Sequence, residues 1–395
     1  MNKTVLISGA GIAGPTLAYW LSRHGFTPTV IERAPVLRTG GYIMDFWGVG
    51  FDVAERMLLI PRLKHAGYEP REVRIVNDSG RRIGGFCTDR LRQTLCDRFF
   101  SIARGDLSKN IYETVEAQVE TVFGDSLRAL QQDECGVAVE FDHSPSRRFD
   151  LVIGADGLHS AVRKLVFGPE SSFATYLGYC AASFAVDGYP HRNESVYVAY
   201  CRPGKQVARF ALRDGRTVFF VIFAAPDIPA VAHHDTDAQK GLLRQVLGDM
   251  GWECPEILKA LDSVEELYFD SVTQVRLLQW HCGRIALVGD AAFCPSLLAG
   301  EGSSLAMAGA YLLAGELRDA GGDFRAAYSS YQRRFKPFIE RKQLLAARFS
   351  RQFAPRTRLG LFVRNLASQL LDVPFVGDMM ANRMFADRFA MPDYS

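Results

Sequence analysis

The segment Thr4–Gly14, with the sequence TVLISGAGIAG, decides the fold of this chain. It opens with an apolar run typical of a buried strand and ends in the spacing Gly-x-Gly-x-x-Gly, made by Gly9, Gly11 and Gly14. An apolar stretch from Ala13 to about His24 predicts a helix directly after the glycines. Glycines at this spacing occur in many turns, but a strand before them and a helix after them indicate a dinucleotide-binding loop.

Each of the three glycines in this loop has a different structural role. The first glycine permits a tight turn, the second lets a pyrophosphate approach the backbone, and the third allows close contact between helix and strand. The backbone N–H groups at the start of the helix, near Ile12 and Ala13, would face the phosphates.

Glu32 supplies the acidic partner that such a loop needs. It ends the expected strand at Thr29–Ile31, where a carboxylate can accept hydrogen bonds from ribose hydroxyls. A surface glutamate after a strand is the plain alternative, but loop, strand and spacing together favour a dinucleotide site. An acid at this point favours an unphosphorylated ribose, and therefore FAD or NAD rather than NADP.

Two later segments repeat the pattern of a strand that ends in a glycine and an acid. The first is 150–157, which contains Asp156-Gly157, and the second is 284–290, which ends in Gly289-Asp290. A Gly-Glu-Gly sequence at 300–302 and a long apolar helix from Ser304 follow the second. In an NAD dehydrogenase these two segments would have no role in cofactor binding and would be present by coincidence. The segments therefore favour FAD over NAD.

In this order and spacing, the three motifs resemble the single-component FAD-dependent aromatic hydroxylases, of which para-hydroxybenzoate hydroxylase is the familiar member. The resemblance covers the chain from Met1 to about Glu340. In length and in the segment Gly40–Asp45, the chain is most similar to the small tetracycline-inactivating monooxygenases.

The resemblance implies a role for each motif. The glycine loop and Glu32 would hold the ADP half of FAD, and Asp290 would bind the hydroxyls of the flavin linker. The helix that begins near Gly300–Ser304 would point its positive dipole end at the N1–C2 carbonyl edge of the ring. The full set of expected cofactor-binding residues is Gly9, Gly11, Ile12, Ala13, Gly14, Glu32, Arg33, Arg38, Asp45, Arg104, Asp156, Asp290, Gly300, Gly302, Ser303 and Ser304.

Some of these residues have plain alternatives. Arg104 matches the family arginine near the cofactor, but it could be a surface arginine at a helix start. Asp156-Gly157 matches, together with Arg163, the Asp-Gly segment of the family, but this dipeptide also favours a simple turn. Arg38 and Asp45 match positions near the cofactor and the reductant.

The chain also departs from the family pattern after Asp290. The family usually has histidine where Phe293 stands, prolines where Ser296 and Leu297 stand, and often asparagine at Ser304. The resemblance places these positions around the reactive face of the flavin, so we expect contacts there to differ. A carboxylate at Glu301 would repel a reduced flavin unless it points to solvent.

These motifs predict an α/β fold in which one domain interrupts another. We expect an FAD-binding, Rossmann-like domain of the glutathione-reductase type at residues 1–70, 103–172 and 276–335. Residues 71–102 and 173–275 should form a β-rich substrate domain, because a hairpin pattern at 71–86 and alternating, aromatic-rich segments after Phe173 predict an antiparallel sheet. Residues 336–395 should form a C-terminal helical segment.

The resemblance implies an FAD-dependent monooxygenase that hydroxylates an aromatic or polyketide-like small molecule. NADH or NADPH would reduce FAD, O₂ would add at C4a to give a hydroperoxide, and its distal oxygen would pass to the substrate. No side-chain nucleophile is required, so no catalytic residue is assigned. The substrate would lie between flavin and β-rich domain, near Arg209, Arg213 and Phe219, although the two arginines could equally face solvent.

The sequence bears on several alternative functions. The departures at Phe293 and Ser304 leave open a non-catalytic flavin protein that binds a small molecule. A flavin-dependent halogenase is disfavoured because none of the four tryptophans forms a Trp-x-Trp pair. A serine hydrolase is disfavoured by the lack of a Gly-x-Ser-x-Gly elbow. His233-His234-Asp235 could suggest a metal, but adjacent histidines on a polar loop usually face water, so no metal is expected.

Composition limits the partners and the compartment. A net charge of +2 without a basic run gives no reason to expect nucleic acid. Eight scattered cysteines without metal spacing and an N-terminus unlike a signal peptide predict a cytoplasmic protein, and we expect a monomer or weak homodimer. The basic, amphipathic segment Thr357–Leu366 could touch a membrane, but we expect it to pack on the protein itself, without stable membrane association.

Overall fold

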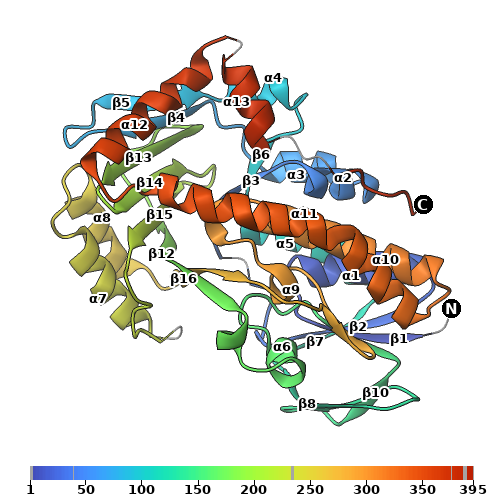
Figure 1. The fold of residues 1–395 in the computed structure, drawn as a ribbon. Helices are drawn as coiled ribbons and strands as arrows, with labels where there is room; N and C mark the ends of the chain where they lie inside the picture. Colours follow the sequence, from blue (N-terminus) through green and yellow to red (C-terminus); the bar gives the residue numbers. More distant parts are fainter. Residues whose placement is uncertain (1–2, 39, 233–234, 375, 386–388, 395) are drawn as a thin grey trace.

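The computed structural model describes residues 3–38, 40–232, 235–374, 376–385 and 389–394. Two sheets lie at opposite ends of the molecule, and the long helix α11 (Phe324–Phe353) runs across both (Figure 1). The expected α/β fold class, with a nucleotide-type sheet interrupted by a second, β-rich sheet, is confirmed.

The first sheet has six strands in the order β17-β18-β11-β1-β2-β7. Neighbours are parallel from β18 to β7, and only β17 runs antiparallel to β18. The apolar strand at Val5–Ile7 is completely buried, as in a parallel sheet covered on both faces. The strands are β1 Thr4–Ser8, β2 Thr27–Glu32, β7 Glu120–Phe123, β11 Leu151–Gly154, β17 His281–Cys282 and β18 Ile285–Leu287.

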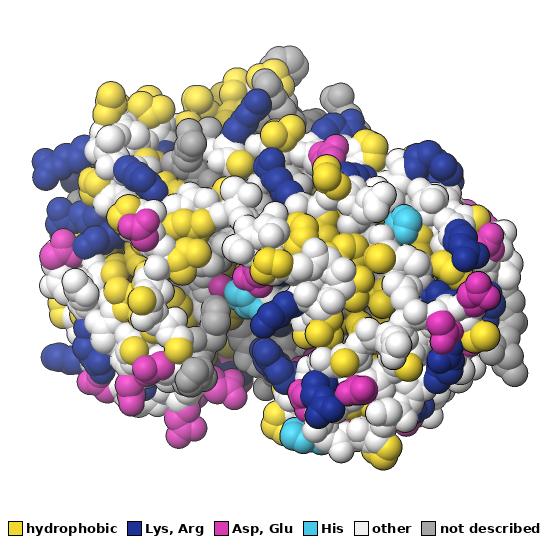
Figure 2. Space-filling view, turned by 60° about the horizontal axis from the view of Figure 1, so that its bottom comes forward, with side chains coloured by type: hydrophobic (Ala, Val, Ile, Leu, Met, Phe, Trp, Pro, Cys, Tyr) yellow, Lys and Arg dark blue, Asp and Glu magenta, His cyan; other side chains and the backbone are white. Residues whose placement is uncertain are grey.

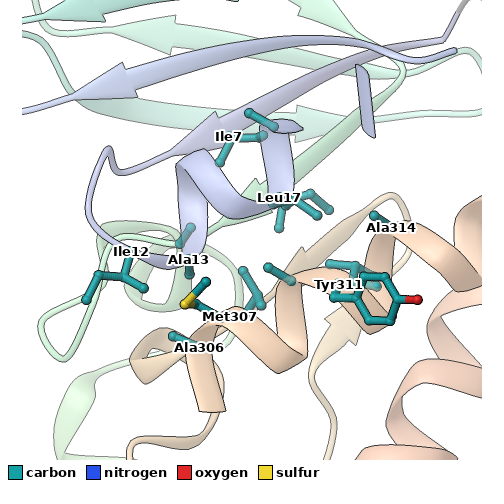
Figure 3. Packing of buried hydrophobic residues seen from close by; sticks show 14 of the residues in the cluster. Ile7, Ile12, Ala13, Leu17, Ala306, Met307, Tyr311 and Ala314 are labelled. Carbon is teal, nitrogen blue, oxygen red and sulfur yellow. The ribbon is translucent and has the colours of Figure 1, made fainter. Parts of the chain in front are cut away.

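Helices α1 (Ala13–Arg23) and α10 (Gly302–Asp319) pack against each other beside this sheet. Figure 3 shows Ala13 and Leu17 of α1 facing Ala306, Met307 and Tyr311 of α10. Every residue of α10 from 304 to 317 is buried, which explains why this stretch is almost entirely apolar. Its one charged residue, Glu316, forms an ion pair with Arg334 at 2.8 Å.

The second sheet has seven strands in the order β16-β12-β15-β14-β13-β4-β5. The predicted hairpin, β4 (Glu72–Val76) and β5 (Arg82–Cys87), joins it through a parallel pairing of β4 with β13. Helices α7 (Thr236–Leu247) and α8 (Cys254–Ala260) bury apolar side chains against one face. The other strands are β12 Ala174–Asp187, β13 Val196–Arg202, β14 Lys205–Ala211, β15 Arg216–Ala224 and β16 Tyr268–Val275.

Two small sheets were not predicted. Strand β3 (Ile43–Phe46) pairs with β6 (Phe100–Ala103), and β8 (Leu127–Gln132), β9 (Val137–Phe141) and β10 (Arg147–Phe149) form a separate meander. The shorter helices are α2 Val49–Arg56, α3 Ile60–Ala66, α4 Asp89–Thr94, α5 Arg104–Tyr112, α6 Ala161–Val166 and α9 Asp290–Phe293.

The region expected as a C-terminal helical segment, residues 336–395, contains helices, but the first of them begins before residue 336. Helix α11 continues through this position and through Pro337, and α12 (Arg358–Gln369) and α13 (Val376–Phe385) follow it. Near the end of the chain, the Tyr394 N–H donates to the Tyr311 hydroxyl at 2.9 Å, which ties the tail to α10. No described helix is both long and apolar enough to cross a bilayer.

Candidate cofactor and substrate site

The three glycines of the first motif have different surroundings. Gly9 has φ +107°, and a Cβ there would lie 2.6 Å from the Ala155 carbonyl oxygen. A Cβ on Gly14 would lie 1.9 Å from the Gly9 carbonyl oxygen. At Gly11, a Cβ would meet only an Arg104 guanidinium nitrogen, at 3.8 Å. Packing therefore requires Gly9 and Gly14, whereas the backbone at Gly11 is open to a ligand.

Glu32 lies beside this loop. Its carboxylate accepts hydrogen bonds from the backbone N–H of Ala10 at 2.8 Å and of Ala34 at 2.9 Å. A carboxylate has about four lone-pair positions, so it retains acceptor capacity for ribose hydroxyls. Arg33 and Arg38 follow β2 as exposed residues.

Arg104 connects the glycine loop with the third motif. It begins α5, its guanidinium lies over Gly11, and its charge acts on Asp290. Burial raises the pKa of the Asp290 carboxyl, and the Arg104 charge opposes this effect. A Cβ on Gly302, at the start of α10, would lie 3.7 Å from an Asp290 carboxylate oxygen. A continuous path therefore runs from Gly11 past Arg104 and Asp290 to α10.

The turn at Gly289 closes this arrangement. A Cβ on Gly289 would lie 3.1 Å from the Ala13 Cβ and 3.4 Å from the Ala306 Cβ, so only glycine lets the turn pack between α1 and α10. Because β1, β2 and β18 are parallel strands of one sheet, Glu32 and Asp290 lie at the same edge. These residues fit a long dinucleotide laid across that edge.

The start of α10 presents backbone N–H groups that can donate hydrogen bonds. The Ser303 hydroxyl donates to the Met44 Sδ at 3.1 Å, and the Ser304 hydroxyl donates to the Trp47 carbonyl oxygen at 3.0 Å. Gly300 has φ +70° and would place a Cβ 3.5 Å from the Trp47 ring. With both hydroxyls engaged, the first backbone N–H groups of the helix remain as donors for an anionic ligand edge.

The sequence suggested that the Glu301 carboxylate would repel a reduced flavin unless it points to solvent. In the structure it does not point to solvent. Its carboxylate pairs with Lys342 of α11 at 2.7 Å, and the two side chains are only 14% and 10% exposed. The lysine neutralises the carboxylate at the start of α10, and the pair ties α10 to α11.

Asp156 supports the start of α6. Its carboxylate accepts hydrogen bonds from the hydroxyl of Ser160, the N-cap residue of α6, and, at 3.1 Å, from the N–H of Val162, the second residue of the helix. Its Cα would lie 2.9 Å from a Cβ on Gly9, so the Asp-Gly segment supports the first glycine turn through its backbone. The buried Arg163 donates to the Ala291 carbonyl oxygen at 3.1 Å and so connects the second and third motifs.

The residues that depart from the family pattern do not all surround the site. Phe293 is 2% exposed and packs on Trp280 and Phe335 in the core, with ring centroids 4.8 and 5.6 Å apart. Its expected place at the reactive face is therefore wrong. Ser296 has φ +119°, and its hydroxyl accepts a hydrogen bond from the Leu298 N–H at 3.3 Å. Leu297 packs against the seven-stranded sheet.

The substrate residues expected from the sequence lie on the helix-covered face of the seven-stranded sheet or beyond the end of β14. Arg209 and Phe219 are directly paired across β14 and β15, on the face that α7 and α8 cover. Arg209 is 4% exposed and forms an ion pair with Glu253 at 2.8 Å. Arg213 lies beyond β14, and it donates to the carbonyl oxygens of residues 65 and 67. The two arginines therefore do not share a face.

The opposite face of the sheet carries an aromatic group that the sequence did not single out. Tyr42 lies 5.8 Å from Phe220 and 5.4 Å from Tyr268, measured between ring centroids, and all three are partly exposed. Burial raises the pKa of Tyr42 to about 12 and that of Tyr268 well above its usual value, so both keep their hydroxyl protons. The charge of Arg104 acts on both tyrosines, which places the group next to the cofactor path.

Asp45 lies on β3, near the same boundary. It accepts a hydrogen bond from the Ser101 hydroxyl at 2.5 Å, and burial raises the pKa of its carboxyl to about 6. Burial raises the pKa of the Tyr197 hydroxyl on β13, and the charge of Asp45 adds to this effect, so Asp45 lies near the seven-stranded sheet.

Charged side chains of both signs are mixed on the surface. Figure 2 shows one face of the molecule, where basic and acidic side chains lie interspersed around a hollow. No group of three or more His, Cys, Asp or Glu side chains placed to hold a metal occurs among the described residues. The pair His233-His234 lies outside the described residues.

The fold and this path of residues define a dinucleotide-binding flavoprotein. Comparison with known proteins is more specific: the family model described as FAD binding domain matches residues 2–340, and the chain belongs to this family of FAD-dependent monooxygenases. A flavin-dependent monooxygenase of Legionella longbeachae is 33% identical, over 89% of this chain and 90% of its own length. An uncharacterized protein of Mycobacterium tuberculosis is 38% identical, over 87% and 93%.

Solved structures agree with the sequence relatives. The crystal structure of the tetracycline destructase Tet(55) aligns with a TM-score of 0.85 at 30% identity, over 100% of this chain and 99% of that one. The expected family, fold and enzyme class are thus confirmed, and the chain is an FAD-dependent monooxygenase.

Proposed function

We propose that this monooxygenase uses NADH or NADPH and O₂ to hydroxylate a flat, ring-containing small molecule, aromatic or polyketide-like. When bound, FAD supplies the redox chemistry, and the chain provides binding, orientation and exclusion of water. The observation that carries the proposal is the partly exposed aromatic group of Tyr42, Phe220 and Tyr268 beside the path from Gly11 to α10.

The residues at the sheet edge would hold the cofactor in three places. Glu32 and the open backbone at Gly11 suit the adenosine and phosphates, and Arg104 supplies a cation over the phosphates. Asp290 suits the hydroxyls of the linker, and the N–H groups at the start of α10 stabilise negative charge on the ring.

Small side chains lie in one row of the seven-stranded sheet, where the substrate would bind. Ser183 and Ala208 are the direct cross-strand neighbours of Phe220, and Ala199 is the neighbour of Ala208. Small residues in one row, with aromatic rings beside them, leave room for a flat molecule that stacks on the rings. The structural relatives Tet(51) and Tet(55) are tetracycline destructases, which supports a substrate with several fused rings.

The residues at positions 293 and 304 no longer support the alternative of a flavin protein without turnover. Phe293 belongs to the core, and the Ser304 hydroxyl is bonded to the backbone of Trp47. We further propose that the enzyme acts in the cytoplasm as a monomer or weak homodimer. All eight cysteines are free thiols, which is usual in a reducing compartment.

The experiment is a substrate screen with two readouts. The FAD-loaded protein is mixed with NADH or NADPH and a panel of one-ring to four-ring phenols and polyketides, and NAD(P)H loss is recorded with the mass of each product. We expect at least one multi-ring compound to accelerate NAD(P)H oxidation and to gain one oxygen atom. If no compound of the panel gains oxygen while free peroxide accounts for all NAD(P)H consumed, the proposed substrate class is wrong.

A further inference from the structure

Helix α12 packs on the protein through its polar side. It lies beside β5 and β13 of the seven-stranded sheet (Figure 1). The Ser368 hydroxyl accepts a hydrogen bond from the Gly85 N–H of β5 at 2.9 Å, and Arg364 donates to the Gln206 side chain at 3.2 Å. The helix therefore rests on its own protein, as expected from the sequence, but with its polar residues inward.

The apolar side of α12 faces outward. Leu359 is 72% exposed, Phe362 65%, Val363 55% and Leu366 54%, and Leu370, just after the helix, is 42% exposed. Their spacing of i, i+3, i+4, i+7 and i+11 places them on one side of a helix. We call these five residues the α12 stripe. A contiguous apolar surface of this kind usually marks an interaction site.

The charged residues of α12 and of the turn before it are all basic. Residues 354–371 contain three arginines, Arg356, Arg358 and Arg364, and no aspartate or glutamate. The acid that follows, Asp372, lies 3.8 Å from Arg82. Arg356 donates to the Gly178 carbonyl oxygen at 2.8 Å, and Arg364 donates to amide and carbonyl oxygens. These contacts satisfy hydrogen bonds without neutralising the charge, and Arg356 and Arg358 are exposed beside the stripe.

We propose that the α12 stripe docks this enzyme reversibly on the surface of an anionic lipid bilayer. An apolar helix side bordered by arginines inserts shallowly among lipid headgroups, and the arginines are attracted to anionic lipid. A second copy of the chain fits less well, because pairing two stripes would bring six like charges together. A single short helix provides weak binding, which agrees with the absence of stable membrane association expected from the sequence.

The test uses the full-length, FAD-loaded protein and vesicle co-sedimentation. We expect binding to vesicles of equal parts phosphatidylglycerol and phosphatidylcholine, much weaker binding to phosphatidylcholine alone, and loss of binding in high salt. The double variant Leu359→Glu/Phe362→Glu should bind at least about tenfold more weakly. Because both side chains are exposed, the variant should fold normally, which its flavin spectrum and circular dichroism will show.

Leu278→Glu is the matched control, because Leu278 is 88% exposed and lies outside α12. It should bind vesicles like the original protein. Absence of binding to anionic vesicles, or equal binding by the double variant, would overturn the proposal. Sedimentation velocity without lipid measures the oligomeric state and so tests whether a second copy of the chain binds the stripe instead. A dimer that the double variant abolishes would assign the stripe to that second copy. None of these readouts depends on turnover or on the proposed substrate.

Discussion

Replacing Lys342 by methionine tests the most unusual ion pair of the site. The pair Glu301–Lys342 is 2.7 Å long and nearly buried, and Glu301 immediately precedes α10. Methionine keeps most of the apolar stem and removes the charge. Removing one partner of a buried pair costs about 3–5 kcal/mol, and the residual exposure of both groups places the expected loss near the lower limit, about 3 kcal/mol.

The double variant Glu301→Gln/Lys342→Met should recover most of that loss, because it leaves no unpaired charge. Urea unfolding, followed by flavin fluorescence and circular dichroism, measures the four free energies of unfolding that a double-mutant cycle needs: those of the original protein, Glu301→Gln, Lys342→Met and the double variant. Additive losses in the double variant would refute the reasoning, since they would mean that the two charges do not interact.

The same variants should shift the reduction potential of bound FAD in opposite directions. If the flavin ring lies at the start of α10, as proposed, Lys342→Met leaves a carboxylate near the ring edge and should make the potential more negative. Glu301→Gln then leaves a cation there and should make the potential more positive. A change of about 1.4 kcal/mol in this interaction corresponds to about 30 mV for a two-electron couple. Spectroelectrochemical titration checks the signs, and shifts of the same sign would show a merely structural role.

Three further predictions concern the glycine loop, Arg104 and His159. Gly14→Ala places a methyl group 1.9 Å from the Gly9 carbonyl oxygen and should abolish FAD retention on purification. Arg104→Met removes the cation over Gly11 and should weaken FAD binding by about 1.5–3 kcal/mol, measured by calorimetry. Hydrogen bonds to Asp270 and then Glu170 raise the pKa of His159 to about 9, so its stabilising effect is complete below about pH 6.5 and disappears as the pH rises through 9. His159→Gln should flatten this part of the stability profile, measured by urea unfolding at each pH.

Each of these variants has a matched control. Gly241→Ala in α7 meets no atom within 4 Å and should retain FAD. Lys109→Met removes another cation from α5, with 58% of its side chain exposed, and should leave FAD affinity unchanged. His191→Gln removes a different histidine–glutamate contact and should leave the slope between pH 6.5 and 9 in place. Equal effects of control and test variants would contradict the assignments.

Local patterns were sufficient to predict the nucleotide-binding half of the site. The order strand, glycine loop, helix and acid depends on neighbouring residues, so the loop and Glu32 could be placed from spacing alone. The same applies to Gly289-Asp290, where a buried strand precedes the acid. These predictions needed only the rule that the carboxyl ends of parallel strands meet at one edge.

The substrate side could not be predicted in the same way. Strand β15 carries apolar residues on both faces, because α7 and α8 cover one face and the cofactor side lies at the other. Without alternation, nothing in the sequence distinguishes Phe219 from Phe220. The partners of Arg209 and Glu301 lie 44 and 41 positions away, on other elements, and such pairs become visible only in the folded chain.

The central claim is that three separate strand ends bind one FAD at its adenosine, its linker and its ring. Calorimetric titration of the flavin-free protein with FAD and with FMN tests it most directly, because FMN lacks the adenosine half that Glu32 and the glycine loop should hold. We predict one FAD per chain and FMN binding weaker by at least about a hundredfold, which corresponds to about 2.7 kcal/mol. Equal affinity for the two flavins, or no binding of FAD, would contradict the claim.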